Sequence, residues 1–330
     1  MIGSPDAVFV GVATWDTVAQ LPRLPAPDGR VVAEEIVGAG GGPAATAAVA
    51  FARLGLRPAL VAAVGDDREG ALIRDGLAAE GVDISDVHTV PGRPSGSCVV
   101  LVDRPRGSRA ICVRPGPGLE IAPDSAAGQA VLSARLLHVD HLGWPAVEPL
   151  LAALPATAPR PLVCYDAGNL EPRRCPDGVD VYVPTLAALR EVYGVRDPRS
   201  GSGPEPRSED LVAPLRAAHA GGAARVVATD GAAGAVAADG AGFHRVPGLT
   251  GIDVRSTLGA GDVFHGALVA AFARDLPLPA ALAYANAAAA LSCRGLDGRS
   301  AIPGHEETAA TAARHPATTL DHPPAVPSSR

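Results

Sequence analysis

Runs of consecutive apolar residues alternate with longer, helix-like stretches over most of the chain. Runs that are apolar throughout are typical of strands buried on both faces, as in a parallel sheet. We expect strands at residues 7–12, 58–64, 135–140, 161–166, 179–183 and 224–229. Between them we expect helices at residues 43–54, 68–80, 145–154, 185–193 and 208–220. This alternation predicts one α/β domain with a parallel sheet covered by helices on both faces.

Two segments, residues 14–40 and 97–113, break the alternation. The first is rich in proline, and the second has two apolar runs separated by a turn, which predicts a hairpin. Together they could form a small β-sheet beside the main domain, that is, a lid. Residues 197–209, rich in Pro, Ser and Gly, and the tail at 304–330 are predicted to be disordered. The folded domain is therefore expected to span residues 1–303.

Composition then excludes several classes of protein. A chain of 330 residues with 47% hydrophobic residues can bury a large core. Its net charge of −7 argues against a nucleic-acid partner. All 28 basic residues are arginine. The chain therefore lacks the lysine that Walker-type phosphate loops, protein kinases and pyridoxal-phosphate enzymes require.

The cysteines and the hydropathy pattern add a cellular expectation. The 5 cysteines are scattered, without the paired spacing of a zinc site or a disulfide framework. No apolar run approaches the roughly 20 residues that a membrane-spanning helix needs. The first residues do not have the pattern of a signal peptide. We expect a reduced, cytoplasmic protein with no membrane partner.

The stretch Gly259-Ala260-Gly261-Asp262 carries the strongest chemical signal. A glycine turn that leads into an apolar helix leaves backbone N–H groups unpaired at the helix start, where the helix dipole favours an anion. An ionised Asp262 beside such an anion could accept a proton from an attacking hydroxyl. An ordinary glycine turn with an acidic residue in the first helical turn is the alternative interpretation.

A second glycine-rich stretch, Gly40-Gly41-Gly42, precedes the helix expected at residues 43–54, and Gly55 follows that helix. Glycines at this place let the backbone approach a ligand closely, although a purely structural role is also open. Three arginines on the predicted hairpin could reach a substrate phosphate or could lie on a solvated face: Arg104, Arg106 and Arg109.

The two glycine stretches, in this order, closely resemble the paired signatures of the ribokinase-like (PfkB) carbohydrate kinase family. The resemblance spans roughly residues 7–303. Further matches lie between and after the signatures: Asp16, Gly65-Asp66-Asp67 with Gly70, Thr229-Asp230-Gly231 with Gly234, and Ala285-Asn286-Ala287.

The resemblance implies a doubly wound, mostly parallel α/β sheet with a small β-sheet lid. It implies transfer of the ATP γ-phosphoryl group to a sugar hydroxyl, with ATP and Mg²⁺ as cofactors and a small sugar as partner. It places Asp262 as the general base and Gly259, Ala260 and Gly261 as the anion hole. The implied substrate residues are Asp16, Gly41, Gly42 and Thr46, and the implied nucleotide residues are Thr229, Gly231, Gly234 and Asn286. Asp140, which follows a predicted strand, could also line the sugar pocket, since family members contact the substrate from this region, or could be a loop residue beside a strand end. The resemblance also allows a homodimer through the lid.

The chain departs from the family pattern at several positions. Thr46 stands where the family usually has Asn, and Ser256 where it often has Asp, which puts a monovalent-cation site in doubt. Thr185 and Ala188 replace the Asn and Glu of a common Asn-x-x-Glu motif, so the metal ligands stay unassigned. A nucleoside kinase and a catalytically weak sugar-binding regulator therefore stay open as alternatives.

Overall fold

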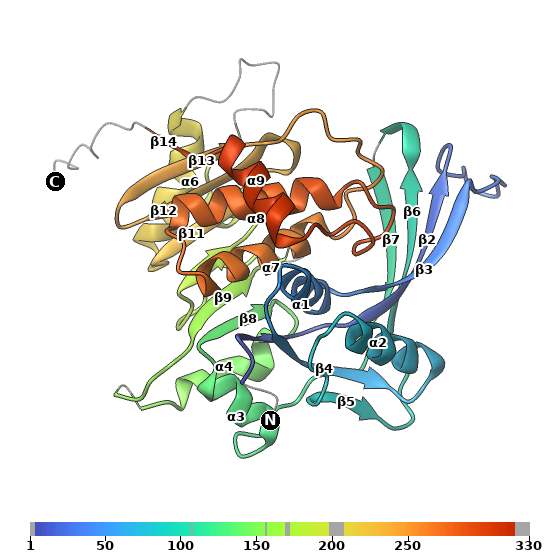
Figure 1. The fold of residues 1–330 in the computed structure, drawn as a ribbon, viewed down its shortest axis with the longest axis horizontal. Coiled ribbons are helices and arrows are strands. Elements are labelled where there is room, and N and C mark those ends of the chain that lie inside the picture. Colours follow the sequence, from blue (N-terminus) through green and yellow to red (C-terminus); the bar gives the residue numbers. More distant parts are fainter. Residues whose placement is uncertain (1–3, 107, 156, 169–171, 198–207, 321–330) are drawn as a thin grey trace.

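The computed structural model describes residues 4–106, 108–155, 157–168, 172–197 and 208–320. These residues form a ten-stranded main sheet, a separate four-stranded sheet, and helices on both faces of the main sheet (Figure 1). The predicted α/β fold is confirmed.

The main sheet has the order β14-β13-β12-β11-β10-β9-β8-β1-β4-β5. Its parallel strands are β1 (Ala7–Val10), β4 (Pro58–Gly65), β5 (Val87–Val90), β8 (Leu136–Asp140), β9 (Leu162–Asp166), β10 (Val181–Val183) and β11 (Arg225–Thr229). An antiparallel extension follows, made of β12 (Gly234–Asp239), β13 (Gly242–Pro247) and β14 (Thr318–Thr319). Strand β1 lies inside the sheet, with Val10 opposite Val61 on one side and Val139 on the other.

Each face of the main sheet has its own hydrophobic core, because successive side chains of a strand point to opposite faces. Ala7 and Phe9 of β1 belong to one core, and Val8 and Val10 to the other. The first core is covered by α1 (Pro43–Arg53), α2 (Arg68–Ala79), α7 (Ala260–Ala273), α8 (Leu278–Ser292) and α9 (His305–Arg314). The second is covered by α3 (Ala126–Ser133), α4 (Trp144–Ala152), α5 (Leu186–Tyr193) and α6 (Ser208–Ala220).

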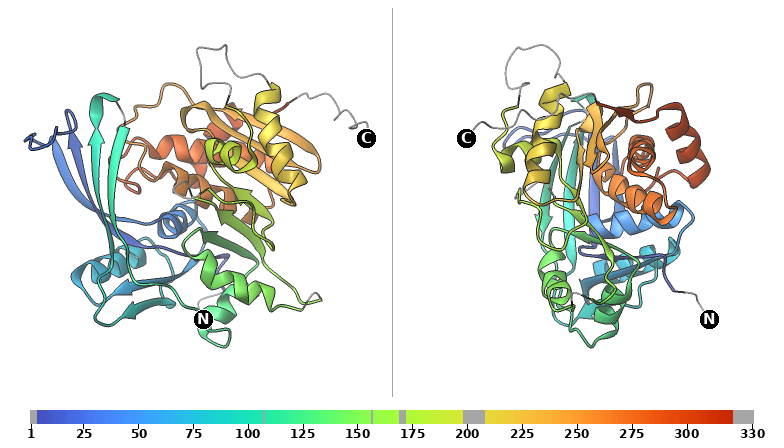
Figure 2. Two further views of the ribbon diagram at one scale, coloured as in Figure 1. Left: turned by 180° about the vertical axis from the view of Figure 1, so that it is seen from behind. Right: turned by 90° about the vertical axis from the view of Figure 1, so that its left-hand side faces the viewer.

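The four-stranded sheet is the lid. It has the order β3-β2-β6-β7, from β2 (Thr14–Leu21), β3 (Glu35–Gly41), β6 (Gly96–Asp103) and β7 (Ser108–Arg114), with the short turn η1 (Arg104–Arg106) between the last two. Figure 2 shows it standing to one side of the main sheet. Val18, Val100 and Val102 on its inner face form a small core with Leu296 of the main domain. The small sheet predicted from residues 14–40 and 97–113 is confirmed.

The predicted disorder at residues 304–330 is wrong for residues 304–320. These residues contain α9 and β14, and β14 pairs with β13. Thr308 and Thr311 of α9 are buried, and Ala309 and Ala312 pack against the first core. Residues 321–330 and most of the other segment predicted to be disordered, 198–207, lie outside the described residues.

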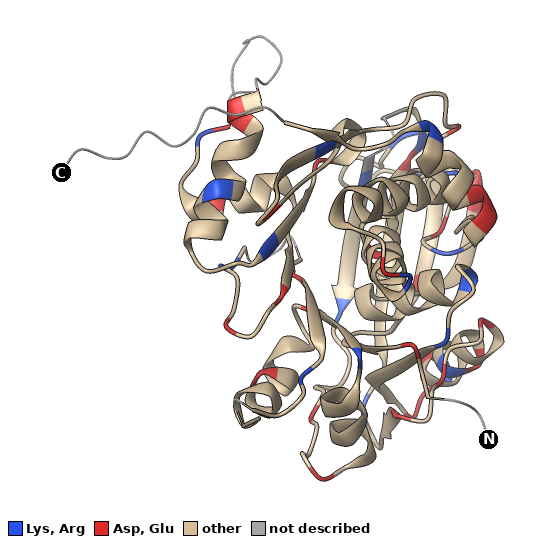
Figure 3. Cartoon of the chain, turned by 60° about the vertical axis from the view of Figure 1, so that its left-hand side comes forward, with Lys and Arg blue, Asp and Glu red and all other residues tan. Residues whose placement is uncertain are grey.

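Basic and acidic residues are interspersed along the described elements (Figure 3). No helix among the described residues is both long enough and apolar enough to cross a membrane.

Candidate active site

The candidate active site lies at the carboxyl ends of the parallel strands, where open α/β sheets bind ligands. Asp140, Asp166 and Thr229 are the last residues of β8, β9 and β11. The base of the lid reaches the same edge, because Asp16 is near the start of β2 and Gly41 ends β3. Helix α7 adds its first turn to this edge.

The first turn of α7 has the geometry of an anion site. Gly259 precedes the helix with a φ of 72°, and a Cβ there would lie 2.7 Å from Gly298 Cα. The Ala260 N–H donates to Thr257 O at 3.3 Å. The N–H groups of Gly261 and Asp262, at the second and third helical positions, have no acceptor within the helix.

Gly261 is a glycine that the fold itself does not require. A Cβ added there would meet nothing within 4 Å, and its φ is not in the left-handed region. Glycine inside a helix costs about 1 kcal/mol relative to alanine. The open space in front of Gly261 therefore suits the close approach of a ligand.

Asp262 is partly exposed beside these N–H groups. Burial, followed by the nearby charges of Asp166 and Asp140, raises the pKa of Asp262 to about 8, while Arg109 and Arg299 act in the opposite direction. A carboxylate with a pKa near neutrality is suited to general-base catalysis.

His265 lies one turn further along α7 and is buried away from solvent. Its Nε2 is 3.3 Å from Asp166 Oδ1, and its ring packs 5.5 Å from the ring of His138. Burial lowers the pKa of His265. This histidine is part of the packing beneath the site.

The lid touches the turn before α7. Arg109, on the inner face of β7, donates from Nη1 to Thr257 Oγ1 at 2.6 Å. This contact brings a cation from the lid close to the start of α7.

The residues predicted to bind the substrate meet at the base of the lid. Asp16 is 7% exposed, and the Thr14 hydroxyl donates to its Oδ1 at 2.8 Å. Burial raises the pKa of Asp16, whereas Thr14, Cys98 and Arg299 lower it. Thr46, in the first turns of α1, is buried nearby.

Each glycine of the Gly40–Gly42 stretch is required by a different neighbour. A Cβ at Gly40 would lie 2.3 Å from Arg299 Nη1, and one at Gly41 would lie 2.1 Å from Asp16 Oδ2. Gly42 precedes α1 with a φ of 91°, and a Cβ there would lie 2.4 Å from Val12 O. The glycines bring the site's own side chains together.

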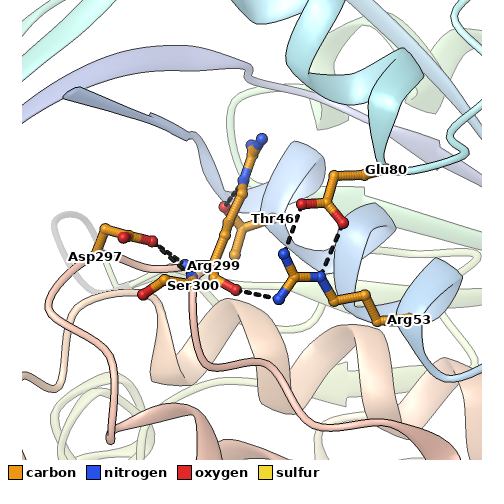
Figure 4. A network of polar contacts seen from close by, with 6 residues as sticks. All are labelled: Thr46, Arg53, Glu80, Asp297, Arg299 and Ser300. Atoms are coloured by element: carbon orange, nitrogen blue, oxygen red, sulfur yellow. Dashed lines mark hydrogen bonds and ion pairs between the residues drawn. The ribbon is translucent and has the colours of Figure 1, made fainter. Parts of the chain in front are cut away.

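The sequence did not single out Arg299. It lies in the loop after α8, and its side chain contacts Thr46 (Figure 4). It also donates to the Gly41 carbonyl oxygen. The only sequence signal is an arginine within the Gly- and Asp-containing run 295–300.

The geometry of Asp140 contradicts its predicted substrate role. It is fully buried, and its carboxylate accepts four backbone N–H groups, those of Val12, Ala44, Leu142 and Gly143. Both oxygens are therefore committed to main-chain donors. Asp140 ties together the segments that surround the site.

The predicted nucleotide residues fall into two groups. Thr229 and Gly231 line a pocket of about 360 Å³, together with Pro172, Thr185, Ala187, Ala188, Glu191 and Asp230. Gly234 and Asn286 are outside this lining: a Cβ at Gly234 would lie 2.1 Å from Val246 O, and the Asn286 side chain donates to Pro247 O at 3.0 Å. Those two residues hold the sheet extension in place.

No group of three or more His, Cys, Asp or Glu side chains in the described part of the chain is placed to hold a metal ion by itself. Glu191 and Asp230 do line the 360 Å³ pocket, and carboxylates are favoured ligands of Mg²⁺. They fit a magnesium ion whose other ligands are phosphate and water.

Comparisons with known proteins identify the family. A model of pfkB family carbohydrate kinases matches residues 5–303. The ATP-dependent ribose-1-phosphate kinase of Halopiger xanaduensis is 30% identical over 304 residues, covering 91% of this chain and 95% of that protein. A nucleoside kinase of Methanothermobacter thermautotrophicus is 34% identical over 98 residues, covering 30% of this chain and 32% of that protein.

A solved structure shows the same fold. The ribokinase of Arabidopsis thaliana, complexed with ribose and ATP, superposes with a TM-score of 0.74 at 22% identity, covering 94% of this chain and 99% of that one. The family match covers both glycine signatures and nearly all of the described fold. The chain therefore belongs to the PfkB family of carbohydrate kinases and is a phosphotransferase that acts on an alcohol group of a sugar or nucleoside.

Proposed function

We propose that the protein is an ATP-dependent sugar kinase in which Asp262 is the general base. The observation that carries the proposal is the position of Asp262 beside unpaired N–H groups and the open space at Gly261. Asp262 takes the proton of the acceptor hydroxyl as its oxygen attacks the γ-phosphorus. The new O–P bond forms while the bond to the β-phosphate oxygen breaks, and ADP leaves.

The charge that develops on the transferring group is stabilised by donors fixed before the reaction. The N–H groups of Gly261 and Asp262 are such donors. The Ala260 N–H joins them by giving up its long bond to Thr257 O. Arg109 adds a positive charge from the lid near Thr257.

The pocket lined by Thr229 and Gly231 is the proposed binding site for the ATP phosphates. Magnesium, when bound, offsets phosphate charge. Glu191 and Asp230 would hold the ion, with phosphate and water as its other ligands. Thr185 caps α5 by accepting the Ala188 N–H at 3.1 Å, so it contributes a helix N-terminus in place of the family's Asn.

Asp16, Gly41 and Thr46 are proposed to receive the hydroxyls of the sugar. The name of the 30% identical relative makes ribose 1-phosphate, and with it ribose, the first acceptors to test.

A nucleoside is the second candidate acceptor. Ile111 and Val113 pair with Val100 and Cys98, so they lie on the same face of the lid as Asp16. They are 44% and 59% exposed. Apolar surface beside the sugar residues suits a nucleobase.

The test measures ADP formation with ribose, ribose 1-phosphate, other sugars and nucleosides at high magnesium. The best acceptor decides between sugar and nucleoside. Asp262→Asn should lower turnover by about 10²-fold or more while both substrates still bind. If the protein binds a sugar tightly but no compound elicits ADP formation, it is a sugar-binding regulator and the proposal fails.

Gly261→Ala is the matched test of the anion site. Because its Cβ meets no protein atom, the variant should be as stable as the wild type or more stable by up to about 1 kcal/mol. Its turnover should nevertheless fall, since the new methyl group occupies the space of the phosphoryl group. Unchanged turnover would remove this turn from the reaction.

A further inference from the structure

Arg299 is buried at the point where the lid meets α1. Its side chain is 7% exposed. Nη2 donates to Gly41 O at 2.7 Å, and Nε donates to Thr46 Oγ1 at 3.2 Å. Nη1 lies against Gly40, where a Cβ would be only 2.3 Å away. The guanidinium therefore contacts Gly40 and Gly41 of the first glycine signature and Thr46 of helix α1 behind it.

The same guanidinium is the cation that acts on Asp16. Burial is the largest influence on the Asp16 carboxyl and raises its pKa, whereas three groups act in the opposite direction: the Thr14 hydroxyl, the Cys98 thiol and, last, Arg299. Arg299 supplies the only full positive charge among these three groups, and Asp16 is in turn the largest of the charges that raise the pKa of Arg299. An ionised carboxylate accepts hydrogen bonds on both oxygens, whereas a protonated one must donate from one of them.

From these contacts we propose that Arg299 is a positioning residue for the acceptor. It fixes Gly41 and Thr46 beside Asp16, so that the acceptor's hydroxyls meet a preformed set of partners. Its positive charge also favours the ionised form of Asp16, against the effect of burial. The inference rests on the proposed function, because it takes Asp16 as the group that receives those hydroxyls.

Arg299 is held from behind by contacts that do not belong to the acceptor site. Asp297 Oδ1 accepts the backbone N–H groups of Arg299 and Ser300, at 2.7 Å each. Arg53 Nη1 donates to Arg299 O at 2.6 Å, and Arg53 itself forms a two-bond ion pair with Glu80 (Figure 4). This outer network supports the loop that carries Arg299 without touching Asp16 or Thr46.

The experiment compares Arg299→Met and Arg299→Lys with the wild type, using the best acceptor of the panel and D-ribose as the reference compound. Loss of hydrogen bonds from a charged donor should raise the KM for the acceptor by about 10- to 100-fold in Arg299→Met. The KM for ATP should change by less than about twofold, because the nucleotide pocket is lined by other residues. Arg299→Lys keeps the charge and should recover part of the loss.

A pH series separates positioning from general support. Without the positive charge of Arg299, the pKa of Asp16 should be higher. As the pH is lowered, the variant should therefore lose acceptor binding at a higher pH than the wild type does. Gly40→Ala should raise the acceptor KM in the same direction, because its methyl group displaces Nη1. Arg294→Met, the control, removes another arginine that follows α8, one that pairs with Glu307, and should leave the acceptor KM unchanged.

Three results would overturn the proposal. They are an acceptor KM that is unchanged in Arg299→Met, an equal rise in both KM values, and a pH profile of acceptor binding that does not move. If Arg299→Met does not fold, Gly40→Ala and Arg299→Lys carry the test. A wild-type protein that phosphorylates no acceptor refutes the proposed function, whereas an active enzyme insensitive to Arg299 refutes this inference alone.

Discussion

Replacing Asp140 by Asn measures how firmly the segments around the site are held together. Oδ2 of Asp140 accepts the N–H groups of Val12 and Ala44 at 2.7 and 3.3 Å, and Oδ1 accepts those of Leu142 and Gly143 at 3.0 and 2.7 Å. An asparagine has one oxygen. Whichever way its amide turns, its NH₂ group faces two N–H donors and cannot accept a hydrogen bond from either.

The expected loss follows from two missing bonds to a charged acceptor. Each contributes about 1.5–3 kcal/mol, so the variant should lose about 3–6 kcal/mol of unfolding free energy. That is a large share of the roughly 5–15 kcal/mol by which domains are stable. On either oxygen one of the two donors is buried, the N–H of Ala44 or that of Gly143, so water does not replace its lost acceptor.

Urea denaturation followed by circular dichroism measures the effect. The urea concentration at the midpoint of unfolding should fall. The slope of the unfolding free energy against urea concentration should stay the same, since the surface exposed on unfolding is unchanged. Asp75→Asn, on the exposed face of α2, is the control and should change stability by less than about 0.5 kcal/mol. A loss below about 1 kcal/mol in Asp140→Asn would refute the reasoning that the four N–H groups depend on both oxygens.

Three further outcomes are expected. The double substitution Thr185→Asn with Ala188→Glu should lower the magnesium concentration for half-maximal rate by up to about 10- to 100-fold. An unchanged dependence of the rate on magnesium would show that other groups compensate for the missing Asn and Glu. A saturating acceptor should protect residues 14–40 and 97–113 from hydrogen exchange, and equal exchange with and without it would contradict the lid's role. The raised pKa of Asp262, about 8 against an ordinary 3.8, means that ionisation disfavours the folded state as the pH rises between these values. Asp262→Asn should therefore melt at a higher temperature than the wild type, by a margin that grows from about pH 4 to pH 8, and a margin independent of pH would contradict the assignment.

The sequence predicts the main sheet well because its central strands are apolar on both faces. Short runs that are apolar throughout are typical of strands buried in this way. It fails at α9, whose contacts with the core come from Ala309, Ala312 and buried threonines. Such small residues leave no strong apolar period. In this alanine-rich chain they do not distinguish a packed helix from a tail.

The site, like the fold, is predictable from the sequence in part. The start of α7 is predictable because the turn, the dipole and Asp262 are neighbours in the sequence. Arg299 is not, because its partners Gly41 and Thr46 are more than 250 positions away. Asp140 stays open at the level of the sequence, because a polar residue at a strand end can face a pocket or bind main-chain donors, and only the fold decides which.

The stretch Gly40–Gly42 has a consequence for how this chain can change over evolutionary time. Gly42 is enforced by the main chain, because its Cβ would meet the Val12 carbonyl oxygen, so selection for folding alone would keep it. Gly40 and Gly41 instead face side chains, with those of Arg299 and Asp16 the nearest. A descendant that had lost catalysis could replace these two glycines once the facing side chains had changed, and Gly261, which no protein atom constrains, would be free to become alanine at once. In such a lineage Gly42 would stay as a mark of the fold, and the other three glycines would record the loss of activity.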